Sequence, residues 1–130
     1  MAKLRKYKRG EDVQLSPNFH LSEFECHCGK CDHTIISLDH VDNLQRKRKE
    51  LKKTINITSA FRCEAYNKKI GGATHSQHKL GMATDIQVKG MTPDEVADAC
   101  EDFSGLGRYN SFTHLDSREN GKARWDLRKK

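Results

Sequence analysis

Long apolar runs are missing from this sequence, and their absence argues against a membrane-spanning protein. No stretch reaches about 18 consecutive apolar residues, the length that a membrane-spanning helix requires. The basic N-terminus is not followed by an apolar segment, so it does not match a secretion signal peptide. We therefore expect synthesis in the cytoplasm, no export by the general secretory route and no membrane partner. An internal repeat and a low-complexity block are absent as well.

Motifs for nucleic-acid recognition are also missing, although the chain is basic. The formal net charge is +6, with basic clusters at both termini and at residues 46–49. Such clusters are typical of solvated helix faces and tails, and they can also attract an anionic polymer such as cell wall or nucleic acid. Because the sequence has no basic groove interleaved with aromatic residues, we expect no nucleic-acid partner.

The five cysteines lack the context of a disulfide scaffold, because a chain without a signal peptide is expected to keep its thiols reduced. Cys26, Cys28 and Cys31 are close together in sequence. Their spacing is compatible with a small structural zinc site that uses His33 or the distant Cys63 as a further ligand. No second Cys-x-x-Cys pair follows, so three interpretations stay open: a structural metal, reduced thiols in a loop, and a disulfide.

At 130 residues the chain is long enough for one domain with its own hydrophobic core. We predict a basic, loosely attached lead-in over residues 1–17, one domain over residues 18–130, and a monomer. Interleaved helices and short strands indicate an α+β fold, a small antiparallel sheet flanked by helices. Periodicity and capping signals predict helices over residues 38–52, 63–70 and 92–103, and strands over residues 54–59, 83–88, 105–109, 112–117 and 123–126.

The strongest chemical signal lies in the middle of the chain. His78 and Asp85 stand seven residues apart, with small residues between them that let the backbone turn closely. An imidazole and a carboxylate are suitable ligands for Zn²⁺, and a catalytic zinc site needs one more protein ligand and an open position for water. The third candidate is His114, in an alternating run that places it on one strand face with Asp116 and Arg118.

The pattern Ser-x-His-x-x-Gly-x-Ala-x-Asp-Ile at residues 76–86, followed by His-x-Asp-x-Arg at residues 114–118, resembles the zinc D-Ala-D-Ala peptidases of the M15 family. Residues 59–67 and the Gly-Gly-Ala at residues 71–73 are similar to two further segments of that family. The resemblance extends over about residues 18–127. It implies a fold shared with hedgehog-type domains and an enzyme that cuts peptidoglycan stem peptides, as a D,D-carboxypeptidase or an L-alanyl-D-glutamate endopeptidase.

The resemblance and the residue chemistry together suggest a ligand set and a substrate grip. The expected zinc ligands are His78, Asp85 and His114. Arg62 is the candidate that grips a substrate carboxylate, because a planar guanidinium pairs with a carboxylate through two hydrogen bonds. Ser76 is expected to add a hydrogen bond to the same group. The structural alternatives are a surface salt bridge for Arg62 and a turn hydroxyl for Ser76.

One position departs from the family pattern. Many relatives place a general base three residues before the last zinc histidine, and this chain has Ser111 there. Asp116 is expected either to orient His114 or to act on the water, with Arg118 as its partner or as a second anion contact. Three explanations therefore stay open: Asp116 or another carboxylate is the base, His75 is the base, or the protein binds without cutting.

These observations favour a zinc peptidase acting on peptidoglycan stem peptides, comparable in size to single-domain phage lysins. Such a lysin waits in the cytoplasm for a holin or travels with the virion. The alternative is a non-catalytic zinc-binding structural or wall-binding phage module, which the serine in place of a base supports. A basic nucleic-acid protein with a cysteine knuckle would explain the charge but not the motif.

Overall fold

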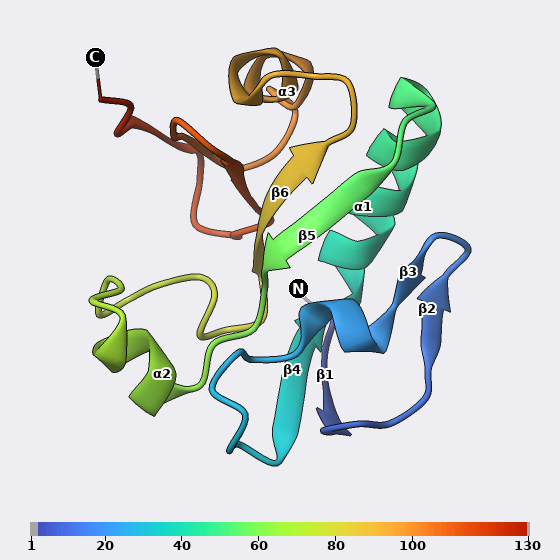
Figure 1. Cartoon of the computed structure of the whole chain (residues 1–130), viewed down its shortest axis with the longest axis vertical. Coiled ribbons are helices and arrows are strands. Elements are labelled where there is room, and N and C mark those ends of the chain that lie inside the picture. Colours follow the sequence, from blue (N-terminus) through green and yellow to red (C-terminus); the bar gives the residue numbers. More distant parts are fainter. Residues whose placement is uncertain (1–2, 130) are drawn as a thin grey trace.

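The computed structural model describes residues 3–129, in which short strands alternate with helices (Figure 1). Every helix and strand predicted from residue 38 onward is present, but the third helix ends at Ala99 instead of near residue 103. In chain order the elements are β1 (Leu4–Lys8), β2 (Gln14–Ser16), β3 (Phe19–His20), the 3₁₀ helix η1 (Leu21–Phe24), β4 (His33–Ser37), α1 (Leu38–Leu51), β5 (Ile55–Ser59), α2 (Glu64–Lys69), β6 (Ala83–Val88), α3 (Pro93–Ala99), β7 (Gly105–Arg108), β8 (Thr113–Asp116) and β9 (Ala123–Asp126).

The N-terminal strands contradict the expectation of a loosely attached lead-in. β1 pairs antiparallel with β4, and β2 pairs antiparallel with β3. Tyr7 and Leu15 from these strands pack against the hydrophobic core. The sequence pattern did not predict β1 because most of its side chains are basic and exposed. Backbone pairing with β4 therefore holds this strand more than apolar burial does.

Helix α1 is the longest helix and joins the N-terminal strands to the main sheet (Figure 1). The hydroxyl of Ser37 caps it by accepting a hydrogen bond from the amide of His40. Val41 and Leu44 on its apolar side are buried. The basic residues 46–49 were expected to point outward, but the side chain of Lys47 is only 5% exposed. Its ammonium donates to a backbone carbonyl at the end of α3 at 2.8 Å, which explains why a lysine is buried there.

Five strands form the main sheet in the order β5-β6-β8-β7-β9. The predicted hairpin is confirmed, because β7 and β8 are antiparallel neighbours. The prediction of an antiparallel sheet is wrong for one strand, because β9 pairs parallel with β7. The direction of β9 depends on the path of the loop that precedes it, and the residues of the strand itself carry no signal for that path.

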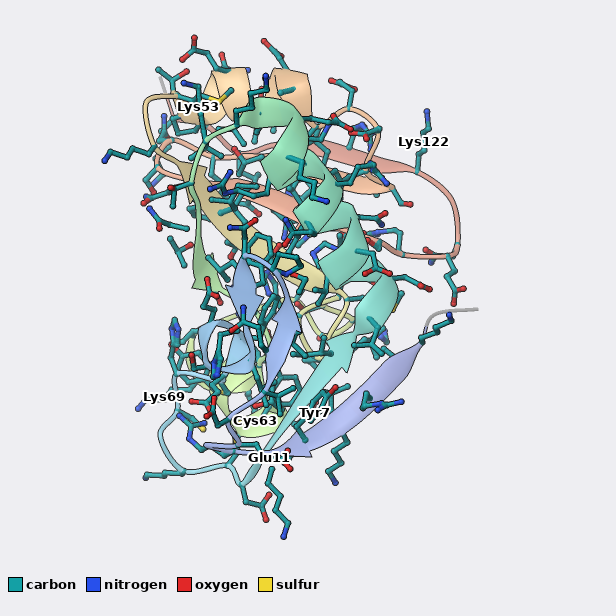
Figure 2. The ribbon with its side chains drawn as sticks, turned by 90° about the vertical axis from the view of Figure 1, so that its right-hand side faces the viewer. Tyr7, Glu11, Lys53, Cys63, Lys69 and Lys122 are labelled. Carbon is teal, nitrogen blue, oxygen red and sulfur yellow. The ribbon has the colours of Figure 1, made fainter. Side chains whose placement is uncertain are left out.

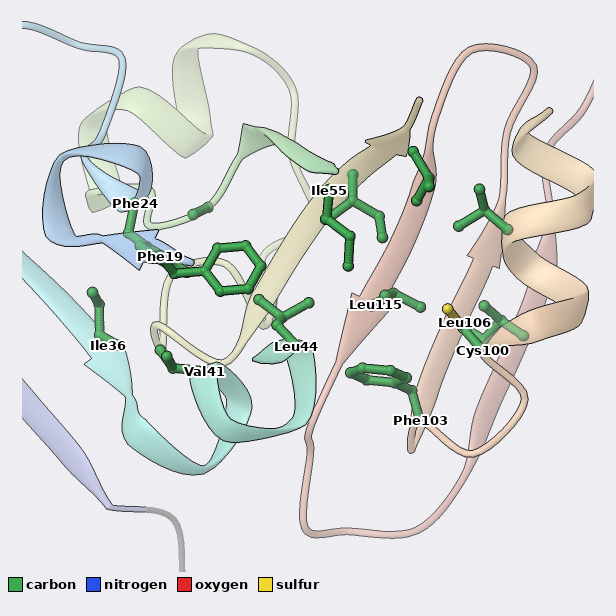
Figure 3. Packing of buried hydrophobic residues seen from close by; sticks show 14 of the residues in the cluster. Phe19, Phe24, Ile36, Val41, Leu44, Ile55, Cys100, Phe103, Leu106 and Leu115 are labelled. Carbon is green, nitrogen blue, oxygen red and sulfur yellow. The ribbon is translucent and has the colours of Figure 1, made fainter. Parts of the chain in front are cut away.

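The hydrophobic core lies on one face of this sheet. Ile86, Leu106 and Leu115 alternate with polar or small residues along their strands and are buried in one cluster. Figure 3 shows Leu44 from α1 and Cys100 from the end of α3 in the same cluster, on the side of the sheet that the two helices cover. The opposite face of the sheet is therefore left for polar side chains.

The basic residues are distributed around the molecule. Figure 2 shows Lys53, Lys69 and Lys122 projecting outward from separate parts of the chain. Other basic residues are paired with carboxylates, as in the contact of Arg108 with Asp94 at 2.7 Å. This distribution agrees with the interpretation of the charge clusters as solvated faces. Among the residues that the structure describes, no helix combines the length and apolar character needed to cross a membrane.

Candidate metal centre

The sheet register aligns a row of residues from four strands across the polar face. Asp85 on β6 lies opposite His114 on β8, which lies opposite Gly107 on β7, which in turn lies opposite Trp125 on β9. Asp116, two residues after His114, points to the same face because side chains alternate along a strand. Residues that are far apart in sequence are thus neighbours here.

His78 reaches this face from the turn-rich segment between α2 and β6. Its carbonyl accepts hydrogen bonds from the amides of Arg62 at 3.1 Å and of Gly81 at 3.2 Å. Gly81 has a φ of 74°, and a Cβ at this position would lie 2.2 Å from the carbonyl oxygen of Ile35 on β4. Only glycine fits such an approach. Gly81, between the two predicted ligands, therefore allows the segment to pack closely against β4.

His78, Asp85 and His114 form a group that could hold a metal ion. One nitrogen or oxygen atom from each side chain lies within 4.8 Å of the others, and all three side chains are buried. Nδ1 of His78 donates to the carbonyl of Ala60 at 2.7 Å, so its Nε2 faces Oδ1 of Asp85 at 3.2 Å. Nε2 of His114 donates to Asp116 at 2.7 Å, so its Nδ1 faces the same Asp85 oxygen at 3.1 Å.

This donor set fits zinc. In neutral rings, the two nitrogens that face Asp85 each present a lone pair, and the carboxylate oxygen presents another. Lone pairs that converge in a buried place require protons or a cation between them. Burial lowers the pKa of His114, but its hydrogen bonds to Asp116 and Asp85 outweigh burial and raise that pKa. A divalent cation satisfies all three atoms at once, with two imidazoles and one carboxylate as ligands.

Asp116 lies behind His114 and is fully buried. Its two oxygens accept hydrogen bonds from the guanidinium of Arg118 at 2.8 and 2.7 Å. Burial would raise the pKa of the Asp116 carboxyl, but Arg118 and His114 hold it well below the usual range. This carboxylate is therefore placed to orient His114, and it does not line the cleft above the group. Arg118 is its partner, and its guanidinium also lies 5.5 Å from the centre of the Trp125 ring.

A cleft of about 570 Å³ opens over the three candidate ligands. Arg62, Ser76 and His75 also line it. Nη2 of Arg62 lies 3.3 Å from Oδ2 of Asp85, and its other nitrogens make hydrogen bonds of 3.4 and 3.5 Å. These contacts are long, so little hydrogen-bond energy holds the guanidinium against turning toward a ligand. The hydroxyl of Ser76 accepts from the amide of His78 at 3.2 Å, and His75 is exposed.

Ser111 lies away from this cleft. It is exposed and lines a different depression, where its carbonyl accepts a hydrogen bond from the side chain of Gln87 at 2.7 Å. Neither Ser111 nor the preceding Asn110 can act as a base near pH 7. Of the two candidate bases from the sequence, His75 lines the cleft and Asp116 does not.

Several residues that shape the cleft received no role from the sequence. Tyr109 and Phe112 stack with their ring centres 4.3 Å apart and form one wall. The ring of Trp125 lies 4.8 Å from the ring of His114, and its indole nitrogen donates to the hydroxyl of Tyr109 at 2.9 Å. The buried Asn67 holds the segment before His75 by donating to the carbonyl of Ala73 at 2.9 Å.

A second group that could hold a metal consists of Cys26, Cys28, Cys31 and Cys63, whose sulfurs all lie within 4.8 Å of one another. Cys63 and not His33 is therefore the fourth member. The backbone amides that point at Cys28 lower the pKa of its thiol to about 6.

Comparison with known proteins agrees with the geometry. A model of the family described as Peptidase M15 matches residues 17–116, well over half of the chain. The chain belongs to the peptidase M15 family. M15 peptidases are zinc-dependent, and the mixed fold of this M15 chain, with its His-Asp-His group, is consistent with that requirement. The search of curated proteins found no match for this M15 chain.

Proposed function

We propose that this M15 chain is a zinc peptidase that hydrolyses stem peptides of peptidoglycan beside a free carboxylate. The observation that carries the proposal is the convergence of His78, Asp85 and His114 under one cleft, with Arg62 beside them. Zinc held by these residues would supply a Lewis acid for the scissile carbonyl and would lower the pKa of a bound water to about 7. The side chains of the protein then have to hold, orient and protonate the substrate.

Arg62 and Ser76 are the residues proposed to hold the substrate. Both line the cleft beside the candidate ligands. A D-Ala terminus, or a D-Glu next to the bond that is cut, presents a carboxylate that the planar guanidinium can bind through two hydrogen bonds. Arg62 makes only long contacts with its present partners, which supports its availability for this role.

His75 is the residue proposed to move the proton. It is exposed and lines the cleft, whereas Asp116 is enclosed by Arg118 and His114. An imidazole can accept a proton near neutral pH and return it to the leaving amine. Asp116 is proposed to keep His114 in the tautomer that presents Nδ1 to the metal.

A second candidate function is a zinc-binding module that recognises the wall without cutting it. Ser111 supports this alternative, because the residue three positions before His114 cannot accept a proton near pH 7. Loss of a general base typically lowers the rate by about 10²–10⁴-fold and leaves measurable turnover. The two functions therefore differ in whether any product forms.

The test is product release from purified peptidoglycan, measured by mass spectrometry with and without a chelator. We expect release in the presence of zinc, none after chelation, and recovery when zinc is returned. Free D-Ala would identify a carboxypeptidase, and new L-Ala carboxyl ends with D-Glu amino ends would identify an endopeptidase. His78→Ala should lose the zinc of the His-Asp-His group and turnover together, whereas His27→Ala, at an exposed histidine outside the cleft, should keep both. Zinc-loaded protein that releases nothing would favour the binding module.

A further inference from the structure

Four cysteines from two separate segments meet at the end of the molecule away from α3. Their four sulfurs lie within 4.8 Å of one another, and the sulfurs of Cys26 and Cys63 are 3.8 Å apart. A tetrahedral zinc with Zn–S distances of about 2.3 Å places its sulfurs about 3.8 Å apart. The thiols are thus already near the spacing that one ion requires. Figure 2 shows Cys63 at the same end of the molecule as Tyr7 and Glu11.

Backbone amides point at two of these sulfurs. The amides of Lys30 and Cys31 point at the sulfur of Cys28, with nitrogen–sulfur distances of 3.3 and 3.2 Å. The amide of Cys63 points at the sulfur of Cys26 at 3.4 Å. The glycine that follows Cys28 has a φ of 70°, which lets the chain turn back so that both sulfurs of the Cys-x-x-Cys unit face the same point. Amides aimed at sulfur favour the charged form that binds metal.

The surroundings also offset the charge of such a site. Four thiolates and one Zn²⁺ carry a net charge of −2, and the four protons leave to solvent when the metal binds. The guanidinium of Arg9, from the end of β1, donates to the sulfur of Cys31 at 3.6 Å and to the carbonyl of Cys26 at 2.8 Å. Lys30 and Lys69 line the depression next to the sulfurs. These positive side chains would therefore offset the negative charge of a four-thiolate zinc site.

The cysteine group is linked to the cleft through a single peptide unit. Cys63 directly follows Arg62. The amide of Arg62 is held by the carbonyl of His78 at 3.1 Å, and the next amide, of Cys63, is directed at Cys26. A metal that fixes Cys63 to the N-terminal loop would therefore also fix the backbone from which Arg62 extends.

We propose that Cys26, Cys28, Cys31 and Cys63 bind a second, structural zinc ion that ties the loop of residues 26–31 to the segment carrying Arg62. This site is separate from the His-Asp-His group and does not depend on peptidase activity. Its four metal–sulfur bonds would hold a loop in which all residues except Cys26 are at least partly exposed.

Zinc content of the purified protein tests the proposal. Cys28→Ser and Cys63→Ser should each hold one zinc per chain fewer than Cys100→Ser, the matched control at a buried cysteine outside the group. His78→Ala should keep the cysteine-bound zinc while it loses the other, so failure of one site is distinguishable from failure of the other. Equal zinc content in Cys28→Ser and Cys100→Ser would overturn the proposal.

Cobalt substitution gives a readout that needs no variant. The unaltered protein reconstituted with Co²⁺ should show the intense near-ultraviolet absorption of cobalt bound to thiolates, and Cys28→Ser should show a weaker band. Cobalt-loaded protein without that absorption would overturn the proposal. So would the finding, by mass spectrometry under non-reducing conditions, that zinc-replete protein carries these cysteines as disulfides.

Discussion

At the scale of single residues, Asp116 shows how a buried carboxylate can serve a metal without touching it. It accepts a hydrogen bond from Nε2 of His114 at 2.7 Å, and both of its oxygens are held by Arg118. The ring of His114 therefore has one fixed tautomer and one fixed orientation. This contact belongs to the site even though Asp116 does not line the cleft.

We expect Asp116→Asn to weaken zinc affinity by about 10–100-fold, because an amide no longer holds His114 as a charged acceptor would. The measurement is competition with a chromophoric chelator. Asp126→Asn is a matched control, since Asp126 holds Arg128 two residues later through the same three nitrogen atoms but is exposed and lies outside the site. If both variants bind zinc as tightly as the parent, Asp116 has no role in the metal centre.

Arg62 is the residue for which two roles compete, holding Asp85 or holding substrate. We expect Arg62→Lys to lower kcat/KM by about 10–100-fold on peptides with a free carboxylate, because a charge-assisted pair is worth about 1.5–3 kcal/mol. The same peptides with amidated ends should be affected little. Arg46→Lys, at an exposed position on α1, is the control. If Arg62→Lys loses zinc, and its kcat/KM falls equally on both kinds of peptide, the role of Arg62 is instead to hold Asp85.

At the scale of elements, β7 illustrates how a strand makes room for a site. Gly105 and Gly107 alternate with Leu106, so the glycines face the polar side of the sheet and the leucine faces the core. A Cβ on Gly105 would lie 2.1 Å from the carboxyl of Asp116, and one on Gly107 would lie 2.4 Å from Nε1 of Trp125. The absence of side chains on this strand is thus required by its neighbours.

We expect Gly105→Ala to destabilise the fold by about 1–3 kcal/mol, because the buried carboxyl beside it is fixed by its partners and cannot move away. Zinc affinity should fall as well, since the displaced carboxyl of Asp116 would turn His114. Urea unfolding measures the first effect and chelator competition the second. Ser104→Ala, at the preceding residue, serves as the control. Unchanged stability in Gly105→Ala would show that the sheet relaxes around the added methyl group.

At the scale of the whole molecule, α1 connects the N-terminal strands to the sheet that carries the site. His40 forms part of that connection: its ring nitrogens lie 2.6 Å from the hydroxyl of Ser117 and 3.0 Å from that of Thr84. Burial lowers the pKa of His40 to about 3, so the folded protein keeps this ring neutral. The unfolded chain has no such burial.

Acid should therefore destabilise the fold through His40. Its pKa is about 6.5 in the unfolded chain and lower in the folded one, so between these values the unfolded state binds the extra proton. The contribution of neutral His40 to the free energy of unfolding is full above about pH 6.5. It decreases as pH falls, by at most about 1.4 kcal/mol per pH unit. Urea unfolding at pH 7 and pH 5 should show a smaller difference for His40→Gln than for the parent or for the exposed His27→Gln. The same difference in all three proteins would contradict the assignment.

Local patterns in the sequence determined much of this protein. The capping box at Thr92, the serine before α1 and the alternation of residues 113–116 each predicted an element, because these signals depend on contacts within a few residues. The sequence also named the three candidate ligands and Arg62, Ser76 and His75, all of which line the cleft, but it did not name the aromatic wall.

Only the tertiary structure decided how those elements meet. The pairing of β1 with β4, the parallel direction of β9 and the burial of Lys47 each depend on a partner far away in sequence. The choice of Cys63 over His33 as the fourth member of the cysteine group has the same origin, because the folded path brings residues 26–31 against Cys63 at the start of α2. Propensity and periodicity act over a few residues, whereas these contacts are set by packing across the whole chain.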